Sequence, residues 1–275
     1  MPDLSVVIVS YNTRDLLRSC LQSLRASVGL DLEIIVVDNA SSDGSAEMAR
    51  GEFPEARLLA QTLNTWYCGG NNIGIKAARA DAVLLLNPDT EVAPDALALL
   101  YRFLLDNPDY VGVTAQLIYP NGETQRTCAR IPEFRHLLFI YTILGYLLPT
   151  TKRELLSDVT YGDWDRLADR DVEAAPGACT MMRRADVWLD DNLLLYFPEE
   201  TLARRHQKPM RFLAAARIKH HEKSSTQSWF ATSIFFRDLL VYCRAHHGVA
   251  RMLLLWALSR PLYWLMWLKN RLPPP

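Results

Sequence analysis

Two kinds of segment alternate over the first ninety residues, and this alternation restricts the fold more than any other feature of the sequence. Runs of β-branched residues such as 5–10 and 32–38 predict strands buried on both faces, whereas 13–24 carries leucines at helical spacing. The same alternation continues with strands at 57–60 and 82–86 and a helix at 71–79. This order favours a mostly parallel sheet with helices on both faces. We therefore predict an α/β fold.

The second half of the chain is less regular. Its patterns predict a helix at 96–105, strands at 111–115 and 177–182, a short helix at 199–205 and further helix over 233–272. A chain of this length suits one large domain, or one domain with an extension. We expect a single α/β domain over residues 1–228 and a C-terminal helical extension over residues 229–275.

Charge and cysteine content exclude several classes of function. The net charge of −1 supplies no general attraction for a nucleic acid, so we expect no nucleic-acid partner. The five cysteines are scattered and form no C-x-x-C pair, which argues against a disulfide framework and a zinc site. The chain enters its first strand pattern without a basic and apolar leader, and the apolar segments 137–148 and 252–268 are too short or interrupted to span a bilayer. We therefore predict a cytoplasmic protein.

Polar side chains follow three of the predicted strands. Ser10 and Tyr11 come after the first strand, Asp38 ends the second, and Asn87 and Asp89 follow the fourth. Because the carboxyl ends of parallel strands meet at one edge of a sheet, we expect these groups to converge. The carboxylate of Asp38 can accept hydrogen bonds from ribose hydroxyls or a base N–H, and Asp89 offers the hard oxygen ligand that Mg²⁺ or Mn²⁺ prefers.

A glycine pair precedes the predicted helix 71–79. The segment 69–72, Gly-Gly-Asn-Asn, is expected at the mouth of that helix, where backbone N–H groups and the helix dipole suit a phosphate. The glycine patterns of dinucleotide-binding and P-loop proteins are both absent from the sequence. Those two classes of nucleotide-binding protein are therefore excluded.

Four motifs in a fixed order resemble one protein family. They are VIVSYN at 7–12, VVDNASSDGS at 36–45, CGGNNIGI at 68–75 and LLNPDT at 85–90. Together they are similar to the family 2 glycosyltransferases, within the rhamnosyltransferase-like branch. The resemblance is dense over residues 4–95 and continues in scattered motifs to about residue 226. It implies a GT-A fold, which is a Rossmann-like domain that binds a nucleotide-sugar, and a reaction that inverts the anomeric carbon.

The resemblance assigns the donor site. It implies that Ser10 and Tyr11 line the nucleotide, that Asp38 contacts the base or the ribose, and that Gly70 and Asn71 lie along the nucleotide. The donor would be a nucleoside diphosphate sugar.

The resemblance also implies a divalent metal. The segment 87–89 matches the family's variant of the D-x-D motif, so Asn87 belongs to the donor site and Asp89 becomes a ligand of Mn²⁺ or Mg²⁺. In the segment 220–225, His220 matches a late histidine of the family that helps to hold the metal or the diphosphate. Arg126 resembles an arginine of the family that pairs with the diphosphate, although an ordinary solvent-exposed side chain explains it as well.

An acidic pair in the second half matches the position of the family's general base. Where relatives carry an acid-rich motif after Leu-Tyr-Phe, this chain has Pro198, Glu199 and Glu200. We assign the base to Glu199, with Glu200 as the alternative. Pro198 can open a helix, so we expect the helix dipole to lower the pKa of both carboxyls and keep them ionised, as a base must be. Both could also be ordinary acids of a helix N-terminus.

The segment 251–271 combines aromatic with basic residues. It contains three tryptophans and a tyrosine together with Arg251, Arg260, Lys269 and Arg271. This composition suits a helix that lies in a membrane interface, and it equally suits a helix pair that packs on the α/β domain or on a second subunit.

The favoured function is an inverting, metal-dependent glycosyltransferase. The branch suggests a dTDP- or UDP-sugar donor, with rhamnose as the sugar, and a glycan or lipid-linked acceptor at the inner face of the membrane, in cell-surface polysaccharide or glycolipid synthesis. One alternative is a non-catalytic relative that binds a nucleotide or a partner, because the base motif is altered at Pro198 and the segment from Leu202 to His220 is short. The other, a nucleotidyltransferase, lacks its glycine-rich basic loop after the first strand.

Overall fold

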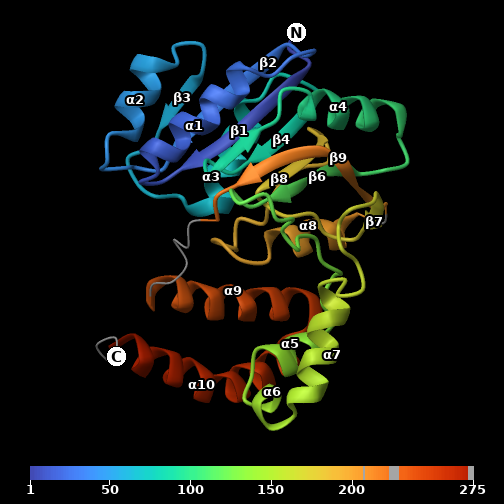
Figure 1. Ribbon diagram of the computed structural model, residues 1–275. Helices are drawn as coiled ribbons and strands as arrows, with labels where there is room; N and C mark the ends of the chain where they lie inside the picture. Colours follow the sequence, from blue (N-terminus) through green and yellow to red (C-terminus); the bar gives the residue numbers. More distant parts are fainter. Residues whose placement is uncertain (207, 223–228, 272–275) are drawn as a thin grey trace.

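The structure is a computed structural model that describes residues 1–206, 208–222 and 229–271. A twisted sheet with helices on both faces forms one part of the molecule, and a group of helices forms a further layer on one side of the sheet (Figure 1). This α/β arrangement with C-terminal helices confirms the predicted fold class.

The first four strands are parallel. They are β1 (Leu4–Ser10), β2 (Leu32–Asp38), β3 (Arg57–Ala60) and β4 (Ala82–Leu86), in the spatial order β3-β2-β1-β4. The helices between them are α1 (Arg14–Arg25), α2 (Ser45–Glu52) and α3 (Trp66–Ala77). The register pairs Ser10 with Asp38 and Ile8 with Leu86, so the three central strands end at nearly the same level of the sheet.

The rest of the sheet is mixed. It adds β8 (Cys179–Arg183), β6 (Gly112–Ile118), β9 (Met210–His220) and β5 (Thr90–Val92) in that order, with β7 (Arg170–Val172) beside β9. β8 runs antiparallel to β4 and β6, and β5 runs antiparallel to β9, whereas β6 and β9 are parallel. The predicted parallel arrangement therefore holds for β1 to β4, and the later strands make the complete sheet mixed.

The later helices divide between the sheet and the outer layer. α4 (Ala96–Asp106) packs on the sheet, and α8 (Pro198–Arg205) follows β8. The outer layer consists of α5 (Phe134–Ile140), α6 (Leu144–Leu147), α7 (Pro149–Val159), α9 (Trp229–His247) and α10 (Val249–Arg271). α9 and α10 lie side by side and run in opposite directions (Figure 1).

The break between α9 and α10 falls at Gly248, whose φ of +87° favours glycine. The predicted boundary at residue 228 falls in the segment 223–228, outside the described residues. Among the residues that the structure describes, no helix is both long enough and apolar enough to cross a membrane.

Successive residues of the central strands are buried on opposite faces of the sheet. Val6 and Ile8 pack with α1 and α4 on one face, whereas Val7 packs with α3 and the helical layer on the other. Continuous β-branched runs in the sequence are therefore the expected result of a sheet covered on both sides.

Two glycines allow α3 to lie very close to β1. A Cβ atom on Gly70 would come 2.7 Å from Cγ1 of Val9, and a Cβ atom on Gly74 would come still closer to Cγ1 of Val7. Because real Cβ atoms do not approach other carbons so closely, any larger residue must push the helix away from the sheet. The glycines of the third sequence motif therefore set the distance between helix and strand.

We expect Gly74→Ala to destabilise the protein by about 1–3 kcal/mol, since the new methyl group overpacks the contact with Val7. Gly51→Ala in α2 is the matched control, because no atom lies within 4 Å of its Cβ position. The control should be neutral or stabilising by up to about 1 kcal/mol, as expected for a glycine inside a helix. Urea unfolding measures the free energy of unfolding of both variants. Equal changes in this free energy for Gly74→Ala and Gly51→Ala would contradict the close packing of α3 on β1.

Candidate active site

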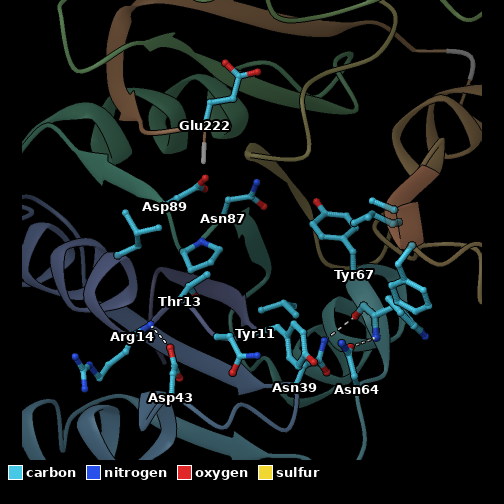
Figure 2. A pocket seen from close by; sticks show the side chains of 18 of the residues that line it. Tyr11, Thr13, Arg14, Asn39, Asp43, Asn64, Tyr67, Asn87, Asp89 and Glu222 are labelled. Atoms are coloured by element: carbon cyan, nitrogen blue, oxygen red, sulfur yellow. Dashed lines mark hydrogen bonds between the residues drawn. The ribbon is translucent and has the colours of Figure 1, made fainter. Parts of the chain in front are cut away.

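A cleft of about 1480 Å³ opens at the carboxyl ends of β1, β2 and β4. Its walls come from the loop after β1, the start of α3, the turn after β4 and the start of α9 (Figure 2). Of the residues singled out from the sequence, Tyr11, Asn87 and Asp89 line this cleft. The common level at which the three strands end explains why their loops meet here.

The loops after β1 and β2 are tied together by backbone hydrogen bonds to side chains. The N–H of Asn12 donates to Oγ of Ser41 (2.9 Å), and the N–H of Ser42 donates to Oδ1 of Asn12 (2.8 Å). The N–H of Arg14 donates to Oδ2 of Asp43 (2.8 Å), a bond that Figure 2 shows beside the cleft. These bonds fix one wall of the cleft before any ligand binds.

Asp38 lies just behind this wall. Its carboxylate is buried, and Oδ2 accepts the N–H of Ser41 at 3.0 Å. Oδ1 is also buried and has no hydrogen-bond partner among the described residues. Buried acceptors are nearly always satisfied, so this oxygen is an exception that lacks a donor from the described residues, although Asp38 does not line the cleft.

Ser10 and Tyr11 take different positions at the end of β1. Ser10 is fully buried and its hydroxyl pairs with that of Thr13 at 2.9 Å, so it supports the wall and does not line the cleft. Tyr11 is exposed, and its side chain lines the cleft. Thr13, which also lines the cleft, was not among the residues singled out from the sequence.

The prediction for Gly70 and Asn71 is wrong in its geometry. The helix begins at Trp66, five residues earlier than predicted, so both residues lie past its first turn. Their backbone N–H groups therefore belong to the helix and are not free for a phosphate. Asn71 is buried, its side-chain amide donates to the carbonyl of Tyr67, and neither residue lines the cleft.

The first turn of α3 supplies an aromatic wall that was not predicted from the sequence. Trp66 and Tyr67 line the cleft, and the ring of Trp66 lies 5.4 Å from the ring of Phe230 in α9. Asn39 holds this turn to β2, since its side-chain amide donates to the carbonyl of Trp66 at 2.9 Å. The polar and aromatic run 64–67, just before the glycine pair, is the sequence feature that could have indicated this wall. The contact of Trp66 with α9 is visible only in the tertiary structure.

Asp89 lines the cleft and faces His220, which does not itself line the cleft. β5 pairs antiparallel with β9 and sets Thr90 opposite His220, which brings Nε2 of His220 to 3.4 Å from Oδ1 of Asp89. The N–H of His221 donates to the carbonyl of Asp89 at 2.9 Å and holds the turn against β9. The remainder of the predicted segment, residues 223–225, lies outside the described residues.

Gln125 fixes the orientation of the His220 ring. Its amide nitrogen donates to the carbonyl of His220 at 2.8 Å, and its amide oxygen accepts from Nδ1 of the ring at 2.8 Å. A neutral imidazole that donates through Nδ1 leaves the lone pair of Nε2 directed at the carboxylate of Asp89. Two electron-pair donors that face each other in this way suit a cation between them.

The pair fits a divalent metal that a substrate helps to hold. Among the described residues there is no group of three or more His, Cys, Asp or Glu side chains that could hold an ion. Mg²⁺ is commonly bound by one or two protein carboxylates together with substrate phosphates, so a carboxylate and an imidazole are a sufficient protein contribution.

The structure does not support a donor contact for Arg126. Its side chain is exposed and does not line the cleft, whereas its neighbour Gln125 is buried against His220. Neighbouring side chains of an extended segment point in opposite directions, so the inward position of Gln125 turns Arg126 outward.

The predicted ionisation of the acidic pair is wrong. Glu199 and Glu200 do lie in the first turn of α8, which begins at Pro198. Burial and the neighbouring Glu200 carboxyl raise the pKa of Glu199 to about 8, and burial also raises the pKa of Glu200. The loss of hydration therefore outweighs the helix dipole that was expected to lower both pKa values.

Glu199 lies behind Tyr67 on the wall of the cleft. The Tyr67 hydroxyl donates to the carbonyl of Gly177 at 2.8 Å. A Cβ atom on Gly177 would come 2.6 Å from that hydroxyl and still closer to the Glu199 carboxyl, so these groups are packed together. Glu199 itself does not line the cleft.

Comparison with known proteins identifies a family. Residues 5–188 match the model of glycosyl transferase family 2. The succinoglycan biosynthesis protein ExoO of Rhizobium meliloti is 29% identical over 175 residues, which cover 58% of this chain and 50% of that protein. The N-acetylglucosaminyl-diphospho-decaprenol L-rhamnosyltransferase of Mycobacterium tuberculosis is 24% identical over 264 residues, which cover 89% of this chain and 81% of that protein.

Solved structures share the fold. The mannosyltransferase PcManGT from Pyrobaculum calidifontis, in complex with GDP-Man and Mn²⁺, has a TM-score of 0.57 at 16% identity, with 87% of this chain and 62% of that chain covered. S. aureus TarS 1–349 has a TM-score of 0.56 at 15% identity, with coverages of 88% and 65%. Both likenesses support the GT-A arrangement of sheet and helices.

We expect Glu199→Gln to raise the Tm at pH 8 by a few degrees and to have little effect near pH 4.5. The folded-state pKa of about 8 lies above the ordinary value of 4.5. Between these values the carboxyl ionises on unfolding, so wild-type stability falls as the pH rises, whereas glutamine does not titrate. Thermal unfolding at several pH values measures the difference. Glu154→Gln, at an exposed position of α7, controls for the loss of one charge. A change in the Tm of Glu199→Gln that does not depend on pH would contradict the raised pKa.

Proposed function

This chain belongs to glycosyl transferase family 2, and on that premise we propose that it transfers a sugar from a nucleoside diphosphate donor to an acceptor hydroxyl with inversion of the anomeric carbon. The observation that carries the proposal is the pair of Asp89 and His220, 3.4 Å apart, of which Asp89 lines a large cleft on the carboxyl edge of the sheet. The pair offers a cation site at the place where the diphosphate of a bound nucleotide would reach.

The nucleoside end of the donor would lie between the loops after β1 and β2. The buried and unpartnered Oδ1 of Asp38 would accept a hydrogen bond from a base N–H or a ribose hydroxyl. The side chain of Tyr11, exposed in the cleft, would cover the nucleoside. We propose a uridine or deoxythymidine donor, supported by the complex of TarS with UDP-GlcNAc among the similar structures. The proposed sugar is rhamnose, supported by the mycobacterial L-rhamnosyltransferase among the relatives.

Asp89 and His220 would hold Mn²⁺ or Mg²⁺, and Asn87 lies on the same turn as Asp89. When bound, the ion supplies charge neutralisation for the departing diphosphate. Gln125 keeps the lone pair of His220 Nε2 directed at this position. The rigid pairing of β5 with β9 holds both ligands in place, which reduces the cost of ordering them when the donor binds.

Glu199 would act as the general base, with Glu200 as the alternative. In the reaction the acceptor oxygen forms a bond to the anomeric carbon as the bond from that carbon to the diphosphate breaks. The acceptor proton passes to the carboxylate. Because the pKa of Glu199 is about 8, only a minority of the molecules carry the ionised base at neutral pH. Tyr67 lines the cleft in front of Glu199, so its side chain would have to move aside for the acceptor hydroxyl to reach the carboxylate.

The acceptor would be a growing glycan or a lipid-linked sugar in the synthesis of a cell-surface polysaccharide or glycolipid. Two relatives support this class, since one is named for succinoglycan biosynthesis and the other acts on a decaprenol-linked sugar. A reaction of this class would take place at the inner face of the membrane.

A non-catalytic nucleotide-binding role is the second candidate. It is favoured by the altered base motif and by the raised pKa of Glu199, which leaves the carboxyl mostly protonated at neutral pH. Binding of nucleotide-sugars without turnover across many acceptors, at any pH, would select this role over transfer.

We expect Asp89→Ala to lower the rate of nucleotide release from a nucleotide-sugar by about 10²-fold or more, because the ion loses its carboxylate ligand. The assay mixes the protein with a panel of nucleotide-sugars and Mn²⁺ or Mg²⁺. Asp95→Ala, at an exposed position close by in sequence, is the matched control and should keep the wild-type rate. Activity of Asp89→Ala equal to that of the control would reject the metal site.

We expect kcat/KM to rise about tenfold per pH unit below a pKa of about 8 and to level above it, because the base must be ionised. Glu199→Gln should remove this dependence together with most of the activity. Glu200→Gln tests the alternative base. If Glu199→Gln keeps the pH dependence of kcat/KM and Glu200→Gln loses it, Glu200 is the general base.

A further inference from the structure

The outward face of α10 is apolar along most of its length. Leu255 and Ser259 are buried on the side that packs against α9. Large apolar side chains are exposed around the remaining sides of the helix, namely Leu253, Leu254, Trp256, Trp264, Leu265 and Leu268. A helix with apolar residues on both sides normally has both sides covered, so this face requires a partner.

The exposed apolar surface continues on α6. Tyr146, Leu147 and Leu148 are exposed at the end of this short helix. The N–H of Ile143 donates to the carbonyl of Leu258 at 3.2 Å, which joins the α6 segment to the middle of α10. Figure 1 shows α6 and α10 together on the side of the molecule farthest from the sheet. We call the exposed residues of these two helices the apolar platform.

Cations accompany the platform. Three of them lie over aromatic rings: Lys152 over Tyr146 at 4.8 Å, Arg260 over Tyr263 at 4.7 Å and Arg251 over Phe134 at 5.5 Å. The α10 sequence contains four basic residues and no acidic one, although the whole chain has a net charge of −1. The side chains of two of the four, Lys269 and Arg271, lie outside the described part of the structure.

This chemistry matches an anionic lipid surface. Tryptophan and tyrosine gather at the boundary between headgroups and hydrocarbon, and basic side chains there are attracted to anionic headgroups. The rest of the chain is net negative, so an anionic surface attracts the α10 side of the molecule and repels the remainder. A second copy fits less well, because a symmetric contact would bring identical basic surfaces together.

Two helices lie between the platform and the donor cleft. Phe230, Ala231 and Ile234 of α9 line the cleft, while Trp229 and Phe236 of α9 pack against Tyr263 of α10. Each helix is about 10 Å thick. An acceptor that is linked to a lipid in a bilayer beneath α10 would therefore have to extend about 20 Å to reach the cleft.

We propose that the apolar platform of α10 and α6 docks on the surface of a bilayer that contains anionic lipids, with α10 lying in the plane of the headgroups. In the docked orientation α9 and α10 lie between the membrane surface and the cleft. Vesicle binding does not depend on turnover, so its absence would leave the proposed glycosyl transfer unaffected.

The test is co-sedimentation of the full chain with vesicles. We expect binding to vesicles of phosphatidylglycerol and phosphatidylcholine, weaker binding to phosphatidylcholine alone, and weaker binding at high salt. The double variant Leu253→Glu with Leu265→Glu should reduce the partition coefficient about tenfold or more, because it places acids in the platform. Leu105→Glu is the matched control, since Leu105 is 62% exposed and Leu253 is 55% exposed, and Leu105 lies on α4, away from the helical layer.

A milder variant, Trp264→Ala, removes apolar contact without adding charge and should also weaken binding. Circular dichroism establishes that each variant is folded. Failure of the wild-type protein to bind, or equal binding by wild type and the double variant, would overturn the proposal. A wild-type dimer that the double variant dissociates, with no binding to vesicles, would assign the platform to a second copy and also overturn it.

Discussion

The parallel register of β1 with β2 and β4 is the constraint on which the site depends. Because Ser10 lies opposite Asp38 and Ile8 opposite Leu86, the loops that follow these strands leave the sheet at one level and can bond to each other. Close packing of Gly70 and Gly74 on β1 then brings the first turn of α3 to the same edge. A shift of one residue in this register would turn every side chain to the other face and separate these groups.

The two acidic parts of the site lie in opposite environments. The carboxylate of Asp89 lies at the open cleft and faces Nε2 of the His220 imidazole, an arrangement that suits a cation. Glu199 is packed beside a second carboxyl and behind Tyr67, and its burial raises its pKa to about 8. Carboxyl groups placed in such different surroundings can take different chemical roles at one pH, as the proposed roles of Asp89 and Glu199 require.

α9 connects the parts of the molecule. The buried carboxylate of Asp238 accepts the N–H groups of Leu194, Leu195 and Tyr196, directly before the helix that carries Glu199. The carbonyl of Leu194 in turn accepts the N–H groups of Tyr67 and Cys68 at the start of α3. The helical layer therefore positions the acidic pair and one wall of the cleft. It is part of the structure of the site and is not only an appendage to the α/β domain.

The amino-acid sequence by itself determined the strand and helix order of the first ninety residues, because β-branched runs and leucine spacing are local properties that burial on a two-sided sheet requires. It also placed Asp38, Asn87 and Asp89 at strand ends, since each directly follows an apolar run. Three facts came only from the tertiary structure. The aromatic start of α3 meets α9, Gln125 orients His220, and burial overrides the helix dipole at Glu199. Each of these depends on contacts between segments far apart in sequence, and on the water that those contacts exclude, which no local pattern records.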